Sequence, residues 1–118
     1  MAKKIIERKD SDGTLIETFE EVDGVRNGLT TYYGKNRNKI CEIEFYDGEI
    51  NGRLIRWNDD GIMIMQAEFK QGEHDGEFRS WWNNGNLKEE GQFSFGKRIG
   101  KYRWYDEDGT LLQEHIYE

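Results

Sequence analysis

The chain contains no proline, one cysteine and two histidines among its 118 residues. A single cysteine cannot form an internal disulfide, which favours a reducing compartment. The first ten residues, MAKKIIERKD, lack the apolar segment of a secretory signal, and no run of about 18 apolar residues is present that could cross a bilayer as a helix. We therefore expect a soluble cytoplasmic protein.

The sequence also lacks the motifs that usually carry catalysis or bind metals. It has no Ser-His-Asp order, no paired histidines at metal-ligand spacing, no CxxC and no phosphate-binding loop. We expect His74 to be a solvated loop residue, His115 to be partly buried and Cys41 to be a small buried thiol. Because a site needs convergent groups, the sequence predicts no enzyme, no cofactor and no metal site.

Positive charge is scarce, since 17 Lys and Arg residues stand against 24 Asp and Glu residues, for a net charge of −7. This balance argues against nucleic acid as a partner, because phosphate binding needs a basic surface. It also disfavours contact with anionic lipid, because the only lysine-rich stretch is AKKIIERK. An acidic protein instead suits a basic protein partner, and the sequence makes no prediction of oligomeric state.

Glycine, in contrast, is frequent and regularly placed. Three ladders of glycines share one interval of 24 residues. They are Gly28, Gly52, Gly76 and Gly100; Gly24, Gly48, Gly72 and Gly96; and Gly13, Gly61, Gly85 and Gly109, with Arg37 at the position that lacks glycine. Three ladders in one register identify an internal repeat.

Apolar residues within each repeat recur at a period of two, which is typical of strands. The columns are Tyr33, Trp57, Trp81 and Tyr105; Leu54, Phe78 and Tyr102; Met63, Leu87 and Leu111; Ile43, Ala67 and Gly91; and Phe45, Phe69, Phe93 and Tyr117. Turn sequences such as NDDG and DEDG separate the two strands of a repeat. We predict an all-β fold, a single domain over residues 1–118, built as an elongated single-layer sheet of about five stacked β-hairpins. The predicted units are 1–28, 29–52, 53–76, 77–100 and 101–118.

The repeat resembles a known family. Its pattern, G-x-aromatic-x-x-aromatic-aromatic-x-x-x-G-x-L-x-x-E-x-x-aromatic-x-x-G-x-x-x-G, is similar to the MORN repeat (membrane occupation and recognition nexus) and, more closely, to the variant in bacterial YwqK-type antitoxin components. The resemblance is strongest over residues 52–118, fair over 29–51 and weak before Gly28. Arg37 stands where the family has glycine, and GKNRNK around it predicts a wider or shifted turn.

Two adjacent tryptophans, Trp81 and Trp82, must point to opposite faces of a strand. Trp81 belongs to the aromatic column and is expected in the core, whereas Trp82 has no aromatic counterpart and is expected on a polar face that binds a partner. The predicted partner-binding residues on this face are Tyr32, Arg56, Trp82, Trp104, Glu42, Glu44, Glu68, Glu90 and Glu114. A solvated face that keeps a thin sheet from aggregating is the alternative interpretation of the glutamates.

These observations predict a protein-binding repeat module. The resemblance implies an antitoxin or immunity protein that neutralises a toxin by covering its surface, and an acidic protein suits a basic toxin. The alternative is a scaffold or membrane-associated MORN adaptor without a toxin partner, because fold alone does not decide function.

Overall fold

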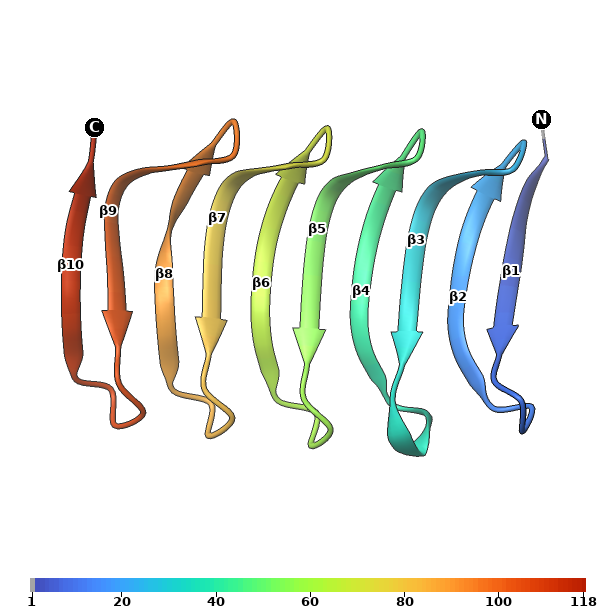
Figure 1. Ribbon diagram of the computed structural model, residues 1–118, viewed down its shortest axis with the longest axis horizontal. Coiled ribbons are helices and arrows are strands. Elements are labelled where there is room, and N and C mark those ends of the chain that lie inside the picture. Colours follow the sequence, from blue (N-terminus) through green and yellow to red (C-terminus); the bar gives the residue numbers. More distant parts are fainter. Residues whose placement is uncertain (1) are drawn as a thin grey trace.

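In the computed structural model, which describes residues 2–118, the chain forms one open antiparallel sheet of ten strands (Figure 1). The order of the strands across the sheet is their order in the sequence, so the two ends of the chain lie at opposite edges. The strands are β1 (Lys3–Lys9), β2 (Leu15–Val22), β3 (Val25–Tyr33), β4 (Lys39–Tyr46), β5 (Glu49–Trp57), β6 (Met63–Lys70), β7 (Glu73–Trp81), β8 (Leu87–Ser94), β9 (Lys97–Tyr105) and β10 (Leu111–Tyr117).

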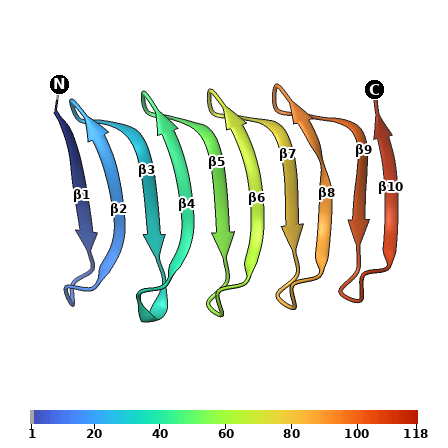
Figure 2. The same ribbon diagram turned by 180° about the vertical axis from the view of Figure 1, so that it is seen from behind.

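The sheet is long and thin. It measures 46 × 32 × 16 Å, with a radius of gyration of 16.5 Å. Seen from behind, the strands stay evenly spaced, and no other described segment covers them (Figure 2). A compact chain of about 100 residues has a radius of gyration of ~13 Å. The prediction of an all-β, elongated, single-layer sheet is confirmed.

Two kinds of turn alternate along the chain. Tight turns at 23–24, 47–48, 71–72 and 95–96 place both residues at positive φ, as in Asp47 (48°) and Gly48 (87°). This is the backbone of a type I′ turn, whose twist matches that of the flanking strands. Loops at 10–14, 34–38, 58–62, 82–86 and 106–110 join the other strand pairs.

The predicted limits of the repeat units, at residues 28, 52, 76 and 100, fall inside β3, β5, β7 and β9. A repeating sequence does not reveal where its own unit starts.

Most of the longer loops close on a side-chain oxygen at their first residue. The Asn58 side-chain oxygen accepts hydrogen bonds from the backbone N–H groups of Asp60 and Ile62, each at 3.0 Å. Asp10 and Asp106 accept the equivalent pairs in their own loops. Short acceptor side chains therefore hold the loops, as expected for Asx turns.

The loop at 34–38 is different in conformation. It contains the 3₁₀ turn η1 (Lys35–Arg37), with Arg37 at a φ of 60° where the related loops have glycine. The sequence predicted a wider or shifted turn here. The loop has the same length as the other loops and differs from them only in its backbone path. No helix among residues 2–118 is long and apolar enough to cross a membrane.

The cross-strand register divides the side chains between two faces. The core face carries the buried residues Ala67, Phe78 and Tyr102, with Met65, Phe69, Phe93, Trp104 and Tyr117 packed against them. The opposite face, called the acidic face, carries Glu42, Glu44, Glu68, Glu90 and Glu114. Since no second layer formed by residues 2–118 covers the core face, its burial comes from neighbouring side chains of the same sheet.

Hydrogen bonds from each tight turn to the strand that follows the preceding tight turn hold the repeats in register. The backbone N–H groups of Gly48, Gly72 and Gly96 donate to the carbonyls of Arg26, Ile50 and His74. Side chains add to this, since Asn51 accepts from the Gln71 N–H at 3.1 Å and Asp75 from the Phe95 N–H at 3.2 Å. These bonds join each repeat to its neighbours, as in other stacked-repeat proteins.

Candidate functional site

The nine residues predicted to bind a partner do not lie on one face. Tyr32 and Arg56 both pair with Cys41, and Trp104 packs against the buried core, so all three lie on the core face. The five glutamates lie on the acidic face. The prediction of a single shared face is wrong, because Tyr32, Arg56 and Trp104 each stand two residues from a core position and therefore share its side of the strand.

The aromatic column expected to form the core also lies elsewhere. Trp81 pairs with Leu87 and alternates with the buried Phe78 and Ser80, which places it on the acidic face. Tyr33, Trp57 and Tyr105 occupy the equivalent positions, and all four side chains are half-buried. Trp81 is therefore an aromatic group beside the glutamates and not a core residue.

Glu44 and Glu68 have a structural role. The Glu44 carboxylate accepts a hydrogen bond from the Arg53 backbone N–H at 3.0 Å and lies against Gly52, whose φ is 115°. Glu68 makes the equivalent contacts one repeat later. The sequence signal for this contact is the recurring spacing Glu-x7-Gly, which the glycine ladders alone do not reveal.

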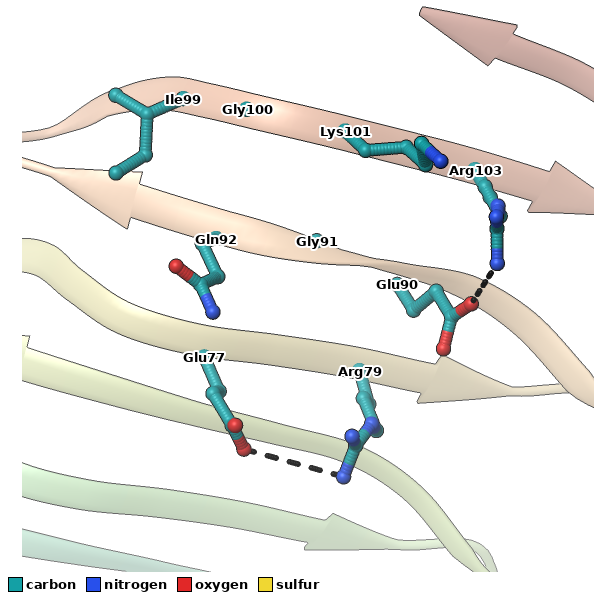
Figure 3. A pocket seen from close by; sticks show the side chains of 9 residues that line it. All are labelled: Glu77, Arg79, Glu90, Gly91, Gln92, Ile99, Gly100, Lys101 and Arg103. Carbon is teal, nitrogen blue, oxygen red and sulfur yellow. Dashed lines mark ion pairs between the residues drawn. The ribbon is translucent and has the colours of Figure 1, made fainter. Parts of the chain in front are cut away.

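A hollow of about 360 Å³ opens on the acidic face where this spacing changes (Figure 3). Gln92 stands at the position of Glu44 in its own repeat, and a Cβ added to Gly100 would meet no atom within 4 Å. The space that a glutamate fills in the earlier repeats is therefore open here. The hollow is lined by Glu77, Arg79, Glu90, Gly91, Gln92, Ile99, Gly100, Lys101 and Arg103.

Ion pairs join the strands at the rim of this hollow. Arg103 lies 3.6 Å from Glu90, and its Nε–H donates to Glu114 at 2.8 Å. The bond with Arg103 lowers the pKa of Glu114, and the same bond raises the pKa of Arg103. Burial, followed by the hydrogen bond that its hydroxyl donates to Glu90, raises the pKa of Tyr105. These contacts hold the side chains of Glu90 and Glu114 in fixed positions at the rim.

The cations at this hollow were not foreseen from the sequence. Arg79 lies 3.9 Å from Glu77, and Figure 3 shows both side chains on the strand beside Gln92. The sequence did contain a signal for these cations. Thr31, Arg79 and Arg103 share one position of the repeat, and that position changes from the uncharged Thr31 in the first complete repeat to arginine in the last two. The acidic face is thus mixed in charge around the hollow and acidic along the earlier strands.

Tyr32 belongs to a charged cluster on the core face. Glu17 is 2% exposed and contacts Arg26 at 2.7 Å and Arg8 at 2.9 Å. Burial opposes ionisation of Glu17, yet the bonds with Arg26, Tyr32 and Arg8 hold its pKa below the ordinary value. Burial and the Glu17 charge raise the pKa of Tyr32. Glu17 was not predicted as part of a site because the equivalent position one repeat later is Cys41.

Trp82 connects its loop to the end of β9. It stands at the loop position where Asp10, Asn58 and Asp106 accept backbone bonds, which an indole cannot do. Asn84 accepts from the Asn86 N–H at 2.9 Å instead. The Trp82 Nε1–H donates to the Tyr105 carbonyl at 3.1 Å, and Lys88 Nζ lies 4.6 Å from the centre of the indole ring. Trp82 is half-buried, and it lines a hollow with Arg56, another predicted site residue.

His74 lies in β7 and not in a solvated loop, so that prediction is wrong. Its ring packs between Phe69 and Phe93, with centroid distances of 4.2 and 4.7 Å. Burial lowers the pKa of His74, and its Nδ1 has no hydrogen-bond partner among the described residues. The error has a physical cause: the tight turn at 71–72 is only two residues long, so His74 already belongs to the strand.

The remaining reactive side chains are isolated. Cys41 is half-buried, and burial raises the pKa of its thiol, which disfavours the reactive thiolate. His115, expected to be partly buried, is exposed on β10. Within residues 2–118, no group of three or more His, Cys, Asp or Glu side chains is arranged to hold a metal ion.

Comparison with known families adds one finding. Residues 75–94 and 98–118 match the family model described as MORN repeat variant. The match supports a MORN repeat protein. The matched MORN segments contain β8 and β10 and most of β7 and β9, and therefore the hollow of Figure 3. MORN repeats are generally protein-binding or membrane-associated modules. No curated protein matches the chain.

Proposed function

We propose that this MORN repeat protein is an antitoxin or immunity protein that binds a basic toxin in the cytoplasm and neutralises it by covering its surface. The observation that carries the proposal is the acidic face. Glutamates from every second strand, β4, β6, β8 and β10, lie on one side of an open sheet. The single half-buried cysteine supports the cytoplasmic assignment.

The spacing of these carboxylates suits a protein surface. Neighbouring strands lie about 4.8 Å apart, so carboxylates on alternate strands recur roughly every 10 Å. Lysine and arginine side chains of a folded partner can meet such a row without bending the sheet. Together with a net charge of −7, the row would speed association with a basic protein and reject an acidic one.

Aromatic anchors share this face. Half-buried Trp57, Trp81 and Tyr105 lie on the same side as the glutamates, and tryptophan and tyrosine often dominate the affinity of protein interfaces. They take the role first assigned to Tyr32 and Trp104, which lie on the core face. The hollow beside Gln92 offers space for one side chain of the partner.

A capture experiment combined with a growth assay tests the proposal. The protein is used to isolate its partner from the source organism, and the partner is then expressed in bacteria with and without it. We expect the partner to be basic and to arrest growth, and co-expression of this protein to restore growth. A captured partner that leaves growth unaffected, or recovery of anionic membranes in place of a protein, would favour the adaptor alternative and contradict the proposal.

A matched pair of variants assigns the effect to the acidic face. The first replaces Glu42, Glu90 and Glu114 by glutamine, which removes three charges from the face. The control replaces Asp12, Asp60 and Asp108 by asparagine, which removes three charges from the exposed loops. We expect only the first variant to lose the restoration of growth, with both variants folded in a thermal melt.

A further inference from the structure

A second hollow, of about 390 Å³, lies on the core face between β5 and β8. Its wall includes Arg56, Met65, Phe78, Ser80, Trp82 and Lys88. It is separate from the hollow of Figure 3, with which it shares no lining residue. Nothing in the proposed action of the acidic face uses it.

Ser80 supplies the first indication that this hollow binds a ligand. The residue is 8% exposed, and its Oγ is buried without a hydrogen-bond partner among residues 2–118. Buried hydroxyl groups are nearly always hydrogen-bonded, because leaving one unpaired is costly. A hydroxyl that lines a hollow and lacks a protein partner is available to donate to an acceptor placed there.

The free charge at this hollow is positive. Arg56 and Lys88 are exposed, and neither forms an ion pair with any described residue. Glu89, the one carboxylate in the wall, accepts the Tyr102 hydroxyl at 2.6 Å and lies 3.6 Å from the guanidinium of Arg98. Glu89 is therefore engaged within the sheet, whereas no described carboxylate pairs with Arg56 or Lys88.

We propose that this hollow binds a carboxylate side chain from an acidic segment of a protein partner. The carboxylate accepts hydrogen bonds from the Ser80 hydroxyl, the Arg56 guanidinium and the Lys88 ammonium group, and bonds between charged groups are stronger than neutral ones. The apolar wall of Phe78, Met65 and Trp82 receives the methylene groups of the side chain. This hollow thus selects negatively charged groups of a partner, whereas the acidic face selects positively charged ones.

A short acidic segment fits better than an extended polyanion. The whole protein carries a charge of −7, which repels a polyanion at long range, so binding must come from local contacts. The apolar wall also distinguishes a glutamate side chain from an inorganic anion, which has no carbon chain to bury. These two features favour a protein carboxylate as the occupant.

Nuclear magnetic resonance titration of the full chain tests the inference without the toxin. The probe is an acetylated, amidated hexapeptide of alternating Glu and Gly, and its control carries Gln in place of Glu. We expect the Glu peptide to shift the Trp82 indole N–H and Ser80 amide signals, and the Gln peptide to bind at least about tenfold more weakly. Equal binding of both peptides, or no binding of the Glu peptide, would overturn the proposal.

Variants on the two faces separate a local site from general attraction. Arg56→Gln and Lys88→Gln should each weaken binding of the Glu peptide by about tenfold. Arg53→Gln, on the same strand as Arg56 but on the acidic face, should leave it unchanged. Ser80→Ala should weaken binding while leaving the melting temperature unchanged or raised, since its hydroxyl has no partner to lose.

Two results would contradict the assignment even if the peptide binds. An equal loss with Arg53→Gln and Arg56→Gln would show general electrostatic attraction and no built site. Inorganic phosphate or anionic lipid vesicles that shift the same signals at lower concentrations than the peptide would show that the occupant is not a protein carboxylate. A failure of the growth assay with the acidic-face variant, in contrast, leaves this titration unaffected.

Discussion

The Glu44 carboxylate lies against Gly52, so closely that a Cβ added to the glycine would come within 2.9 Å of Oε2. Glu44 is on β4 and Gly52 on β5, and the carboxylate also accepts the backbone N–H of Arg53. The contact therefore joins strands on either side of the tight turn at 47–48. It recurs at Glu68 and Gly76, which identifies it as part of the repeat.

Replacing this glycine should be costly. Gly52→Ala combines a φ of 115°, which L-residues rarely adopt, with a clash against Glu44, and we expect a loss of about 1–3 kcal/mol in the free energy of unfolding. The control is Gly61→Ala, at a φ of 83° with no atom within 4 Å of the added Cβ. Chemical denaturation should show a clearly smaller loss for Gly61→Ala; equal losses would show that the Glu44 contact is unimportant.

Phe78 and Trp82 should differ in their contributions to stability. Phe78 is 8% exposed in the core cluster, and Phe78→Ala should lower the free energy of unfolding by about 3 kcal/mol. Trp82→Phe removes one hydrogen bond to the Tyr105 carbonyl but keeps a ring in place, and should cost about 1 kcal/mol. Denaturation curves of the two variants check this, and a larger loss at Trp82 would place the main core elsewhere.

His74 should make the fold sensitive to mild acid. Burial lowers its pKa in the folded state, so the unfolded chain binds the proton more readily and stability falls as the pH drops below about 6.5. His74→Phe should remove this loss, with its largest advantage at acidic pH. His115→Gln, which changes the exposed histidine, is the control. The measurement is a series of thermal melts between pH 5 and pH 8, about the range in which histidine titrates. If the melting temperatures of the wild type and of His74→Phe change in parallel over this range, the account is contradicted.

Phe95 occupies an unfavourable backbone position. It has a φ of 50° in the tight turn at 95–96, and its side chain is 80% exposed. Asparagine tolerates this conformation better than a bulky residue does, so Phe95→Asn should raise the free energy of unfolding by about 0.5–1 kcal/mol. The bond from its backbone N–H to Asp75 would be kept. A melting temperature equal to or below that of the wild type would contradict this expectation.

The fold could be predicted from the sequence because glycine spacing and alternation are local signals. Gly61 recurs as Gly13, Gly85 and Gly109, and so marks the same loop in most repeats. The faces were harder to assign, because alternation shows that Tyr32 and Tyr33 point in opposite directions but not which direction is the core. Burial at Ala67 and Tyr102 decides this, and it depends on contacts between repeats.

The candidate sites depend on departures from the repeat. Gln92 in place of a glutamate opens the hollow on the acidic face, and Trp82 in place of an Asx residue reaches the end of β9. The sequence showed that Trp82 is unusual, but its hydrogen bond to Tyr105 joins residues 23 positions apart. Such contacts follow from the stacking of loops, which a single repeat cannot reveal.

The most direct test of the central claim is the rate at which the captured partner associates with the protein as salt is varied. Removing Glu42, Glu90 and Glu114 by substitution with glutamine should slow association by about tenfold at low salt and flatten its dependence on ionic strength. The Asp12, Asp60 and Asp108 to asparagine variant should associate like the wild type. If both variants keep the wild-type rate and salt dependence, the acidic face is a solvated surface and does not bind the partner.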